Sequence, residues 1–459
     1  MSDAEAAALD ELRGALPGGR LLTDPDVMDG YRRDETPAVR PGQPCCVVLA
    51  GTTQDVAAAL GWAQRHRVPV VPRGSGTSLA GGATATDGCL VLSTARMTAI
   101  RELDAANEII VAEAGALTAD LDRAAAEHGL MYAPDPSSFE ICTIGGNLAT
   151  NAGGLRCVKY GVTRDSVLGL EVVLPGGQIV RTGRRTVKGV AGYDLTGLFV
   201  GSEGTLGVIT SATLRLRLRP ASYPRTVAAG FPSFGAAARA VAAILAARLR
   251  PSLLELMDSA TLRAIDQWKS TGFGGAVQAL LIGQDDGEQA DAGVARMRDI
   301  CLREGAAMAE VSDSEAESRE LLELRRLAYP ALERLGATLT EDVCVPRTRL
   351  PDMVQRIERA ALRHGVFIAT VAHAGDGNLH PLFVFERGLP DVPAPVWAAA
   401  DEIFRAALEL GGTLTGEHGV GIIKRRWLAE ELGPESMSVH HAIKNALDPD
   451  GIMNPGKVL

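Results

Sequence analysis

The 459-residue chain has only seven cysteines, and they are scattered along it. Only Cys45 and Cys46 are adjacent and no CxxC pair occurs, so the sequence supports neither a disulfide framework nor a cysteine-held zinc or iron–sulfur site. No run of about 20 apolar residues is present, and a membrane span is therefore not expected. The acidic start at Met1 lacks the basic and apolar order of a secretion signal, which predicts a cytoplasmic location and leaves peripheral attachment at the inner face of the membrane open.

Basic residues are fewer than acidic ones, with 46 Lys and Arg against 56 Asp and Glu. The net charge is -10 and the isoelectric point is near 5.4, which argues against binding to nucleic acid, because phosphate neutralisation needs a basic surface. Hydrophobic residues make up 46% of the chain and charged residues 22%, as in globular proteins. The length exceeds what one hydrophobic core usually serves, so two or more domains are expected.

The first half of the chain predicts a mixed α+β domain. A strand at Cys45 to Ala50 precedes a helix that Thr52 caps and that runs to about Gln64, and a second strand follows at Val68 to Val71. The hydrophobic pattern predicts further strands at Cys89 to Ser93, Ile109 to Ala112 and Leu170 to Leu174, and a helix at Leu117 to His128 closed by Gly129.

The pattern changes near Arg219-Pro220, where we place a domain boundary. Alanine-rich helices are expected beyond it at Phe234 to Leu249, Gln289 to Arg303 and Glu315 to Leu335, with strands at Val277 to Ile282 and Phe367 to Val371. We therefore predict three parts: residues 1–219, residues 220–410, and a helical segment at residues 411–459.

Three glycine-rich segments, all predicted to be loops, dominate the first half: Pro72 to Gly82, Ile144 to Gly154 and Gly201 to Ile209. Glycine loops present backbone N–H groups to a diphosphate. The fingerprint GxGxxG fails because Leu79 stands at the third glycine, and no Walker-type GxxxxGK[ST] is present, so the Rossmann and P-loop interpretations are rejected. One such loop alone is more often a plain turn, whereas three together favour an extended ligand with phosphate and aromatic parts.

The segment from His373 to His380, with Glu417-His418 downstream, resembles a reaction centre. Two imidazoles and a carboxylate suit Zn²⁺ or Mn²⁺, and three protein ligands leave coordination positions open for a substrate. The spacing is not that of a helical HExxH motif, and Gly375-Asp-Gly377 predicts a turn between two strands that brings the imidazoles together. A pair of hydrogen-bonded core histidines is the alternative for His373 and His380.

These motifs resemble a known family. The three glycine segments, with Pro134-Asp-Pro-Ser137 and Lys159-Tyr-Gly161, resemble the FAD domain of the vanillyl-alcohol-oxidase or PCMH type. Glu341 to Leu350, His373 to His380, Gly416-Glu-His-Gly419 and Asn454-Pro-Gly456 resemble the D-lactate dehydrogenase and glycolate oxidase catalytic-subunit branch. The resemblance implies an α+β fold with a two-subdomain PCMH-type FAD domain, and a cap domain in which helices flank an antiparallel sheet.

The resemblance also implies a set of site residues. The metal ligands would be His373, His380 and Glu417, the base would be His418, and hydride would pass from the substrate Cα to flavin N5. Arg325 would clamp the substrate carboxylate, although Leu324-Arg-Arg326 also suits a solvated pair on a helix face. The residues that would hold FAD are Pro72, Arg73, Gly74, Ser75, Gly76, Thr77, Ser78, Pro134, Asp135, Ser137, Gly145, Gly146, Asn147, Thr150, Asn151, Gly153, Gly154, Tyr160, Gly161, Val162, Glu203, Gly204, Val208, Ile209 and Asn454.

Departures from the family pattern limit the expected type of FAD attachment and the expected substrate. Ser75 and Thr77 stand where members with covalent FAD carry a histidine, which predicts a non-covalent flavin. Thr340 and Leu382 stand where the 2-hydroxyglutarate branch carries a cation and an amide, so a small D-2-hydroxy acid, D-lactate or glycolate, is the expected substrate. D-2-Hydroxyglutarate oxidation, an ether-lipid-type synthase without net redox, a metallohydrolase and a structural FAD subunit remain alternatives.

The expected partner is an external electron acceptor: a quinone, a cytochrome, an electron-transfer flavoprotein or an iron–sulfur subunit. A dehydrogenase is favoured over an oxidase, because the chain has no cysteine cluster of its own. A homodimer is expected only from the general frequency of dimers.

Overall fold

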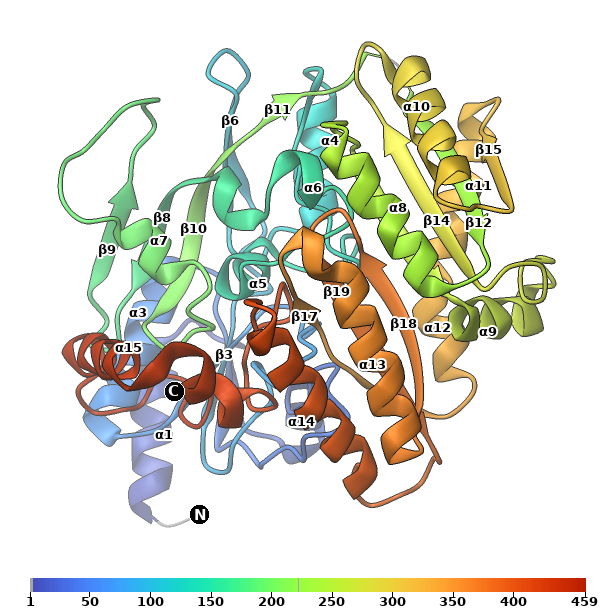
Figure 1. Cartoon of the computed structure of the whole chain (residues 1–459). Helices are drawn as coiled ribbons and strands as arrows, with labels where there is room; N and C mark the ends of the chain where they lie inside the picture. Colours follow the sequence, from blue (N-terminus) through green and yellow to red (C-terminus); the bar gives the residue numbers. More distant parts are fainter. Residues whose placement is uncertain (1–2, 222) are drawn as a thin grey trace. The chain divides into compact units, whose positions relative to one another are not determined.

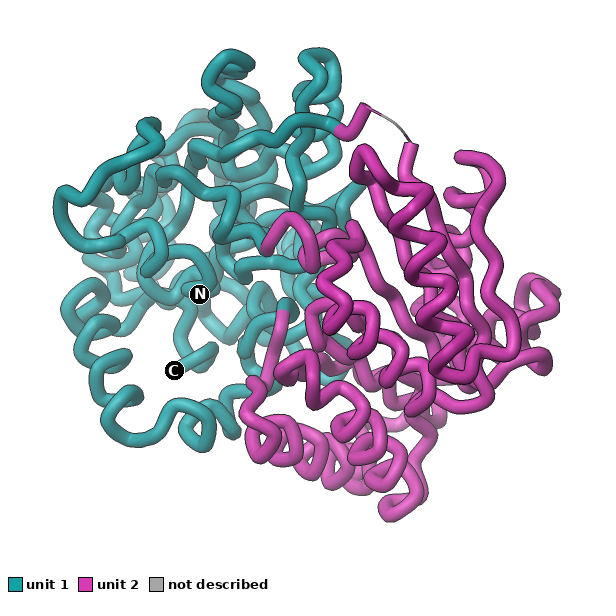
Figure 2. Tube along the Cα trace, turned by 45° about the horizontal axis from the view of Figure 1, so that its top comes forward, with its two compact units in different colours: residues 1–153, 162–219, 417–459 teal, residues 154–161, 220–416 magenta. Residues whose placement is uncertain are grey.

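The computed structural model describes residues 3–221 and 223–459, and it confirms the expected α+β class (Figure 1). It contains two compact units (Figure 2). The first comprises residues 1–153, 162–219 and 417–459 apart from the undescribed start, and the second comprises residues 154–161 and 220–416 apart from residue 222. The ranges 1–219, 220–410 and 411–459 remain predictions about domains, since compact units record packing and not independent folding.

One sheet of the first unit is built on the predicted β-α-β start. Its strand order is β1-β2-β4-β3, and β4 pairs in parallel with both β2 and β3. The bounds are β1 (Leu21–Leu22), β2 (Cys46–Leu49), β3 (Val70–Arg73) and β4 (Leu90–Ser93), with helices α1 (Asp3–Ala15), α2 (Pro25–Met28) and α3 (Thr53–His66). Thr52 and Asp55 form a capping box at the start of α3, which confirms the predicted cap.

The second sheet of this unit is antiparallel, with strand order β5-β6-β10-β8-β9. Its strands are β5 (Ile100–Asp104), β6 (Ile109–Glu113), β8 (Val167–Val173), β9 (Ile179–Gly183) and β10 (Val208–Arg215), beside a two-stranded pair of β7 (Leu130–Met131) and β11 (Arg217–Leu218). The helices are α4 (Thr118–Ala126), α5 (Ile144–Thr150), α7 (Leu195–Phe199) and α15 (Arg425–Leu447), and α15 is kinked at Gly433 before Pro434. Apolar side chains of β6, β8 and β10 form a core with α4 and α5.

The second unit holds one eight-stranded antiparallel sheet, as predicted for the cap. Its order is β15-β12-β14-β13-β18-β19-β16, and β17 also pairs with β19. The strands are β12 (Arg225–Phe231), β13 (Leu253–Asp258), β14 (Ala279–Asp285), β15 (Met308–Val311), β16 (Ala337–Thr340), β17 (Val343–Cys344), β18 (Phe367–His373) and β19 (Asn378–Phe385). The helices are α6 (Cys157–Tyr160), α8 (Phe234–Ala246), α9 (Ser259–Lys269), α10 (Ala290–Arg303), α11 (Glu315–Arg326), α12 (Ala328–Glu333), α13 (Leu350–His364) and α14 (Ala394–Glu409).

Two predictions about local structure are wrong in detail. The predicted loop from Ile144 to Gly154 begins as helix α5, because the Thr143 side chain accepts the Gly146 N–H while Ile144 and Leu148 are buried. The predicted helix from Glu315 to Leu335 is two helices, α11 and α12, that meet at Leu327. In the part of the chain that the structure describes, no helix is long and apolar enough to cross a membrane.

Candidate functional site

The hairpin of β18 and β19 brings His373 and His380 together, as the sequence predicted. His380 lies opposite Val371, and Val371 is two residues from His373, so both imidazoles lie on one face of the sheet. The ring centroids are 5.0 Å apart with planes at 82°, and the two residues are only 3% and 5% exposed. Gly377 closes the turn at φ +82°, where a Cβ would lie 2.1 Å from the carbonyl oxygen of Val345. Only glycine fits this turn without strain.

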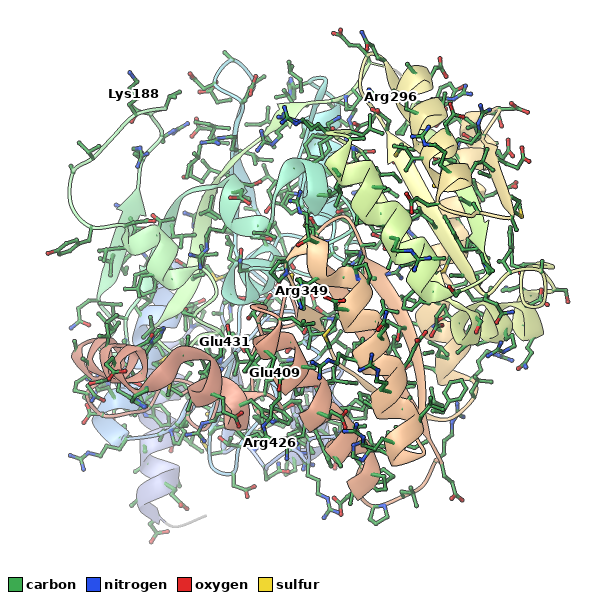
Figure 3. The ribbon with its side chains drawn as sticks, viewed as in Figure 1. Lys188, Arg296, Arg349, Glu409, Arg426 and Glu431 are labelled. Carbon is green, nitrogen blue, oxygen red and sulfur yellow. The ribbon has the colours of Figure 1, made fainter. Side chains whose placement is uncertain are left out.

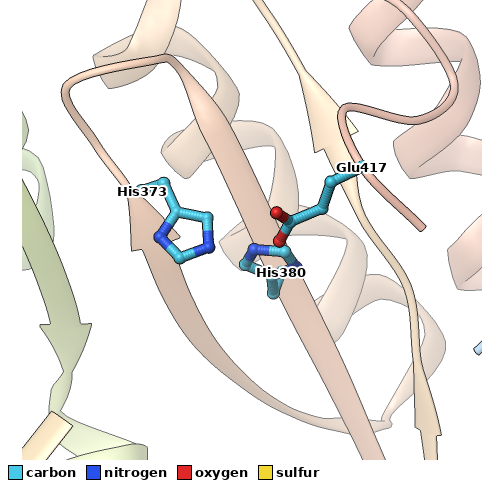
Figure 4. A group of neighbouring side chains, drawn as sticks. All are labelled: His373, His380 and Glu417. Carbon is cyan, nitrogen blue, oxygen red and sulfur yellow. The ribbon is translucent and has the colours of Figure 1, made fainter. Parts of the chain in front are cut away.

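Glu417 completes the predicted set of three metal-type ligands (Figure 4). One ligand atom of each of His373, His380 and Glu417 lies within 4.8 Å of the others. Glu417 follows Gly416, whose N–H donates to Asp342 Oδ2 at 2.7 Å, and the Thr415 hydroxyl donates to the same carboxylate. Asp342 is fully buried, so the chain just before Glu417 is firmly held. Two imidazole nitrogens and a carboxylate oxygen at this spacing fit a divalent cation of the Zn²⁺ or Mn²⁺ type.

A buried carboxylate that sequence reasoning missed supports this hairpin. Glu255 on β13 is the direct Cα partner of His373 on β18, and its carboxylate oxygens lie 2.8 and 3.0 Å from His373 Nδ1. Its side chain is completely buried. No sequence motif marks Glu255, because it lies 118 residues before His373 and only strand pairing brings the two together.

Arg325 contacts the same carboxylate. Its Nε donates to Glu255 Oε2 at 2.8 Å, and its side chain is 11% exposed. The alternative of a solvated arginine pair is therefore wrong for Arg325, whereas its neighbour Arg326 is exposed and pairs with Glu323. Because Arg325 donates to Glu255 from Nε, the clamp role predicted for Arg325 concerns its two Nη groups.

His418, the predicted base, is half-buried and follows Glu417 directly. Glu203 fixes the chain that follows His418. Its two carboxylate oxygens accept the N–H groups of Val420 and Gly421 at 2.8 and 2.9 Å. Burial raises the pKa of Glu203 to about 7, although these two N–H donors favour its ionised form. Glu203 thus joins the predicted FAD loop at 201–209 to the segment that carries His418.

The predicted FAD-binding residues of the first unit are interlocked by polar contacts. Ser75 Oγ donates to the Ile141 carbonyl at 2.6 Å, and Asn454 Nδ2 donates to the carbonyl oxygens of Gly82 and Glu203 at 3.0 and 2.7 Å. Asn454 therefore joins two of the glycine segments, and Lys457 Nζ in turn donates to its Oδ1. Burial lowers the pKa of Lys457 to about 8.

The glycines of these segments are close to their neighbours. A Cβ at Gly74 would lie 2.1 Å from Thr143 Oγ1, and one at Gly145 would lie 2.8 Å from the Ala114 Cβ. A Cβ at Gly153 would lie 2.4 Å from Glu417 Oε2, so the predicted metal ligand packs directly on the end of a predicted FAD segment. Close packing within the chain thus favours glycine at these positions, and glycine-rich segments of this kind can present backbone N–H groups to a diphosphate.

Tyr160, another predicted FAD residue, belongs to the short 154–161 segment of the second unit. Its hydroxyl donates to Asp286 Oδ2 at 2.6 Å, and Lys159 forms an ion pair with the same carboxylate. Val158 packs on the hairpin turn, since a Cβ at Gly375 would lie 2.7 Å from its side chain. The segment directly after Gly153 is therefore anchored beside the metal-type hairpin.

Three more of the predicted FAD residues, Arg73, Asn147 and Asn151, take part in hydrogen bonds within the first unit. Arg73 donates from Nη1 to the Arg33 carbonyl at 2.6 Å, and Arg164 N–H donates to Asn151 Oδ1 at 2.9 Å. Asn147 is buried and donates to the Thr118 hydroxyl at 2.7 Å. Asn151 adopts φ +53° and ends helix α5.

Histidines outside the motif have ordinary surface roles. His66 and His364 are the last residues of α3 and α13 and lie 2.9 and 3.0 Å from Glu11 and Glu402. His440 is exposed on α15 and bonds the Ser436 carbonyl.

Comparison with known proteins decides the family. The model for the FAD linked oxidases, C-terminal domain, matches residues 221–458, and the model for an FAD binding domain matches residues 44–183. The chain belongs to the FAD-linked oxidases. This family is FAD-dependent and redox-active, which confirms the predicted flavoprotein oxidoreductase.

Relatives of this FAD-linked oxidase align along nearly its whole length. It is 43% identical to the glycolate oxidase subunit GlcD of Bacillus subtilis, over 93% of this chain and 91% of the relative. It is 36% identical to GlcD of Escherichia coli, with 97% and 89% covered, and 37% identical to a D-lactate dehydrogenase of Archaeoglobus fulgidus, with 94% and 96% covered.

Solved structures show the fold. A p-cresol methylhydroxylase with substrate bound superposes with a TM-score of 0.82 at 18% identity, and covers 100% of this chain and 97% of that one. An alkyldihydroxyacetonephosphate synthase superposes with a TM-score of 0.72 at 20% identity, and covers 98% and 84%. These similarities confirm the predicted PCMH-type architecture and show the fold alone.

Proposed function

We propose that this FAD-linked oxidase oxidises a small D-2-hydroxy acid, D-lactate or glycolate, to the 2-oxo acid and passes the electrons to an external acceptor. The observation that carries the proposal is the cluster of His373, His380 and Glu417, whose ligand atoms lie within 4.8 Å of one another. A flavin by itself accounts only for the acceptance of hydride. A divalent cation held by three protein ligands is suited, in addition, to binding a substrate with adjacent carboxylate and hydroxyl oxygens. The names of the glycolate oxidase and D-lactate dehydrogenase relatives support the same substrate class.

In this proposal each residue has one task. His373, His380 and Glu417 hold a divalent cation, which when bound would orient the hydroxy acid and make its hydroxyl more acidic. His418, next to Glu417, removes the hydroxyl proton, for which an imidazole is suited at neutral pH. The Nη groups of Arg325 bind the substrate carboxylate. The glycine segments would hold FAD without a covalent bond, and the bound flavin would supply the acceptor for the hydride from Cα.

The proposed size limit on the substrate rests on β16 and β19. Thr340 and Leu382 are direct cross-strand partners, so the two positions that lack a counter-charge lie side by side. Leu382 is 2% exposed and belongs to an apolar cluster that includes Leu332 and Val371. A second substrate carboxylate near this pair would lose water without gaining a cation or an amide.

We therefore expect kcat/KM for D-2-hydroxyglutarate to be at least about 100-fold below that for D-lactate or glycolate, because an unpaired buried charge costs several kcal/mol. Steady-state rates with the three acids and an artificial acceptor measure this ratio. Thr340→Lys supplies the missing charge beside Leu382 and is expected to raise the relative rate with the dicarboxylate. A parent enzyme that prefers the dicarboxylate would overturn the substrate proposal.

The redox proposal is tested with the purified protein under nitrogen. Adding D-lactate or glycolate is expected to bleach the flavin absorption near 450 nm, which a metallohydrolase, a synthase without net redox or a structural FAD subunit would not show. Denaturation is expected to release FAD into the supernatant, because Ser75 and Thr77 offer no histidine for a covalent link. A yellow precipitate would contradict the non-covalent attachment of FAD. Unchanged absorption near 450 nm with every acid would contradict the proposed redox function.

An external acceptor is the last part of the proposal. The Bacillus and Escherichia relatives are named subunits, which supports a partner protein. Among the described residues, no group of cysteines is placed to hold a metal or an iron–sulfur cluster, which supports an electron acceptor outside this part of the chain. In the same experiment, air is expected to reoxidise the reduced flavin far more slowly than an artificial acceptor does, and reoxidation by air at the turnover rate would indicate an oxidase.

A further inference from the structure

We infer that Glu255 is the positioning residue of the metal centre, where it holds His373 in the orientation and tautomer that a cation needs and holds Arg325 in place by the same carboxylate. The inference rests on the proposed function, since it assumes a cation at His373. It adds a role for a residue that no motif marks.

The position of Glu255 is fixed by the backbone of the sheet. Glu255 and His373 are direct partners in the pairing of β13 with β18, and β13 is also paired with β14 on its other side. Directly opposite residues have Cβ atoms about 5 Å apart, which is within reach of a carboxylate and an imidazole. Both side chains are buried, at 0% and 3% exposure, so water does not compete for their hydrogen bond.

The chemistry of the pair selects one tautomer. An ionised carboxylate can only accept, so the contact of 2.8 Å between Glu255 Oε1 and His373 Nδ1 requires the proton on Nδ1. The lone pair of a neutral ring is then on Nε2, which is the nitrogen that would bind the proposed cation. Metal-binding histidines commonly donate their other N–H to a carboxylate in this way, and loss of that partner typically weakens metal binding about 10- to 100-fold.

Arg325 supplies a positive charge next to this buried carboxylate. A buried carboxylate without a cation is costly, and the Arg325 Nε lies 2.8 Å from Glu255 Oε2. Glu255 thus contacts the proposed metal ligand with both oxygens, and Oε2 also accepts from the proposed carboxylate clamp. Loss of the Glu255 charge is therefore expected to disturb both His373 and Arg325. An ion pair that only stabilised the fold would not have this effect on the two site residues.

The main test compares the metal affinity of the FAD-loaded parent with that of Glu255→Gln and Glu255→Asp. Glutamine keeps the size and removes the charge, whereas aspartate keeps the charge and withdraws the oxygens from His373. Dissociation constants for Zn²⁺, measured by competition with a chromophoric chelator, are expected to rise about 10- to 100-fold in both. The d–d absorption of bound Co²⁺ is expected to change, while FAD content stays at the parental level.

Asp258→Asn is the matched control. Asp258 is the last residue of the same strand, is partly buried, and accepts N–H groups of Thr261 and of Thr370 on β18. It is expected to lower the melting temperature and leave Zn²⁺ affinity unchanged. In a His373→Ala background, Glu255→Gln is expected to have no further effect on Zn²⁺ affinity, because its route to the cation is gone.

The outcomes separate this inference from the proposed function. A parent that binds no metal overturns both. If the parent binds Zn²⁺ and either Glu255→Asp or Glu255→Gln binds it with the same affinity as the parent, only the role of Glu255 is overturned. Equal loss of affinity in Asp258→Asn would reduce Glu255 to a general support of the fold and would also overturn the inference.

Discussion

His418→Ala is expected to slow anaerobic flavin reduction by D-lactate or glycolate about 10²- to 10⁴-fold, the range that a positioned general base contributes. His418 follows Glu417 directly, and Glu203 fixes the chain after His418 by accepting the N–H groups of Val420 and Gly421. Removing the ring removes the proton acceptor and leaves that support intact. Stopped-flow absorbance near 450 nm under nitrogen measures the rate of the reductive step directly.

His440→Ala is the control for this variant, since His440 is exposed on α15 and its Nδ1 lies 2.8 Å from the backbone carbonyl oxygen of Ser436. It is expected to reduce its flavin at the parental rate. FAD content and metal content of His418→Ala are expected to be unchanged. If His418→Ala reduces its flavin within about threefold of the parent, a base role that should contribute 10²-fold or more is disproved.

Loss of the metal centre is the second large effect. His380→Ala removes one of three ligands, and turnover is expected to fall on the order of 10²- to 10³-fold, because a Lewis acid contributes several kcal/mol and about 1.4 kcal/mol corresponds to a tenfold change. Treating the parent with a chelator is expected to cause a similar loss, and adding back Zn²⁺ or Mn²⁺ is expected to restore activity only in the parent. Elemental analysis alongside the rates identifies the ion.

The matched control is His364→Ala. His364 ends helix α13 and contacts Glu402, so its loss is expected to alter stability slightly and leave metal content unchanged. FAD binding provides a second control, since the glycine segments of the first unit are expected to keep the cofactor when the cation is removed. Full activity in a parent shown to be metal-free would contradict the proposed role of the cluster and leave the flavin assignment standing.

Much of this site could be predicted because its residues are local in the sequence. His373 and His380 lie on either side of a Gly-Asp-Gly turn, and the alternation of the flanking strands places both rings on one face of the sheet. The helix at Thr53–His66 was predicted for a similar reason, since the capping box of Thr52 and Asp55 lies within four residues.

Errors arose where packing overrode local composition. The segment after Thr143 contains Gly145 and Gly146, which favour a loop, yet it forms helix α5 because Thr143 caps it and two of its apolar residues are buried. The sequence also left two alternatives for Arg325, a carboxylate clamp or a solvated pair with Arg326. Burial separates them: Arg325 meets Glu255, and Arg326 faces water.

The sequence by itself determined the α+β class, the family, the hairpin that carries two imidazoles and the glycine segments for a flavin, because each follows from residues close together in the chain. Only the tertiary structure decided which distant groups support them. Glu255 reaches His373 across 118 residues through strand pairing, and Asn454 joins Gly82 and Glu203 across 372 and 251 residues. Such contacts depend on register and burial, which are properties of the packed sheet and core and have no local signature.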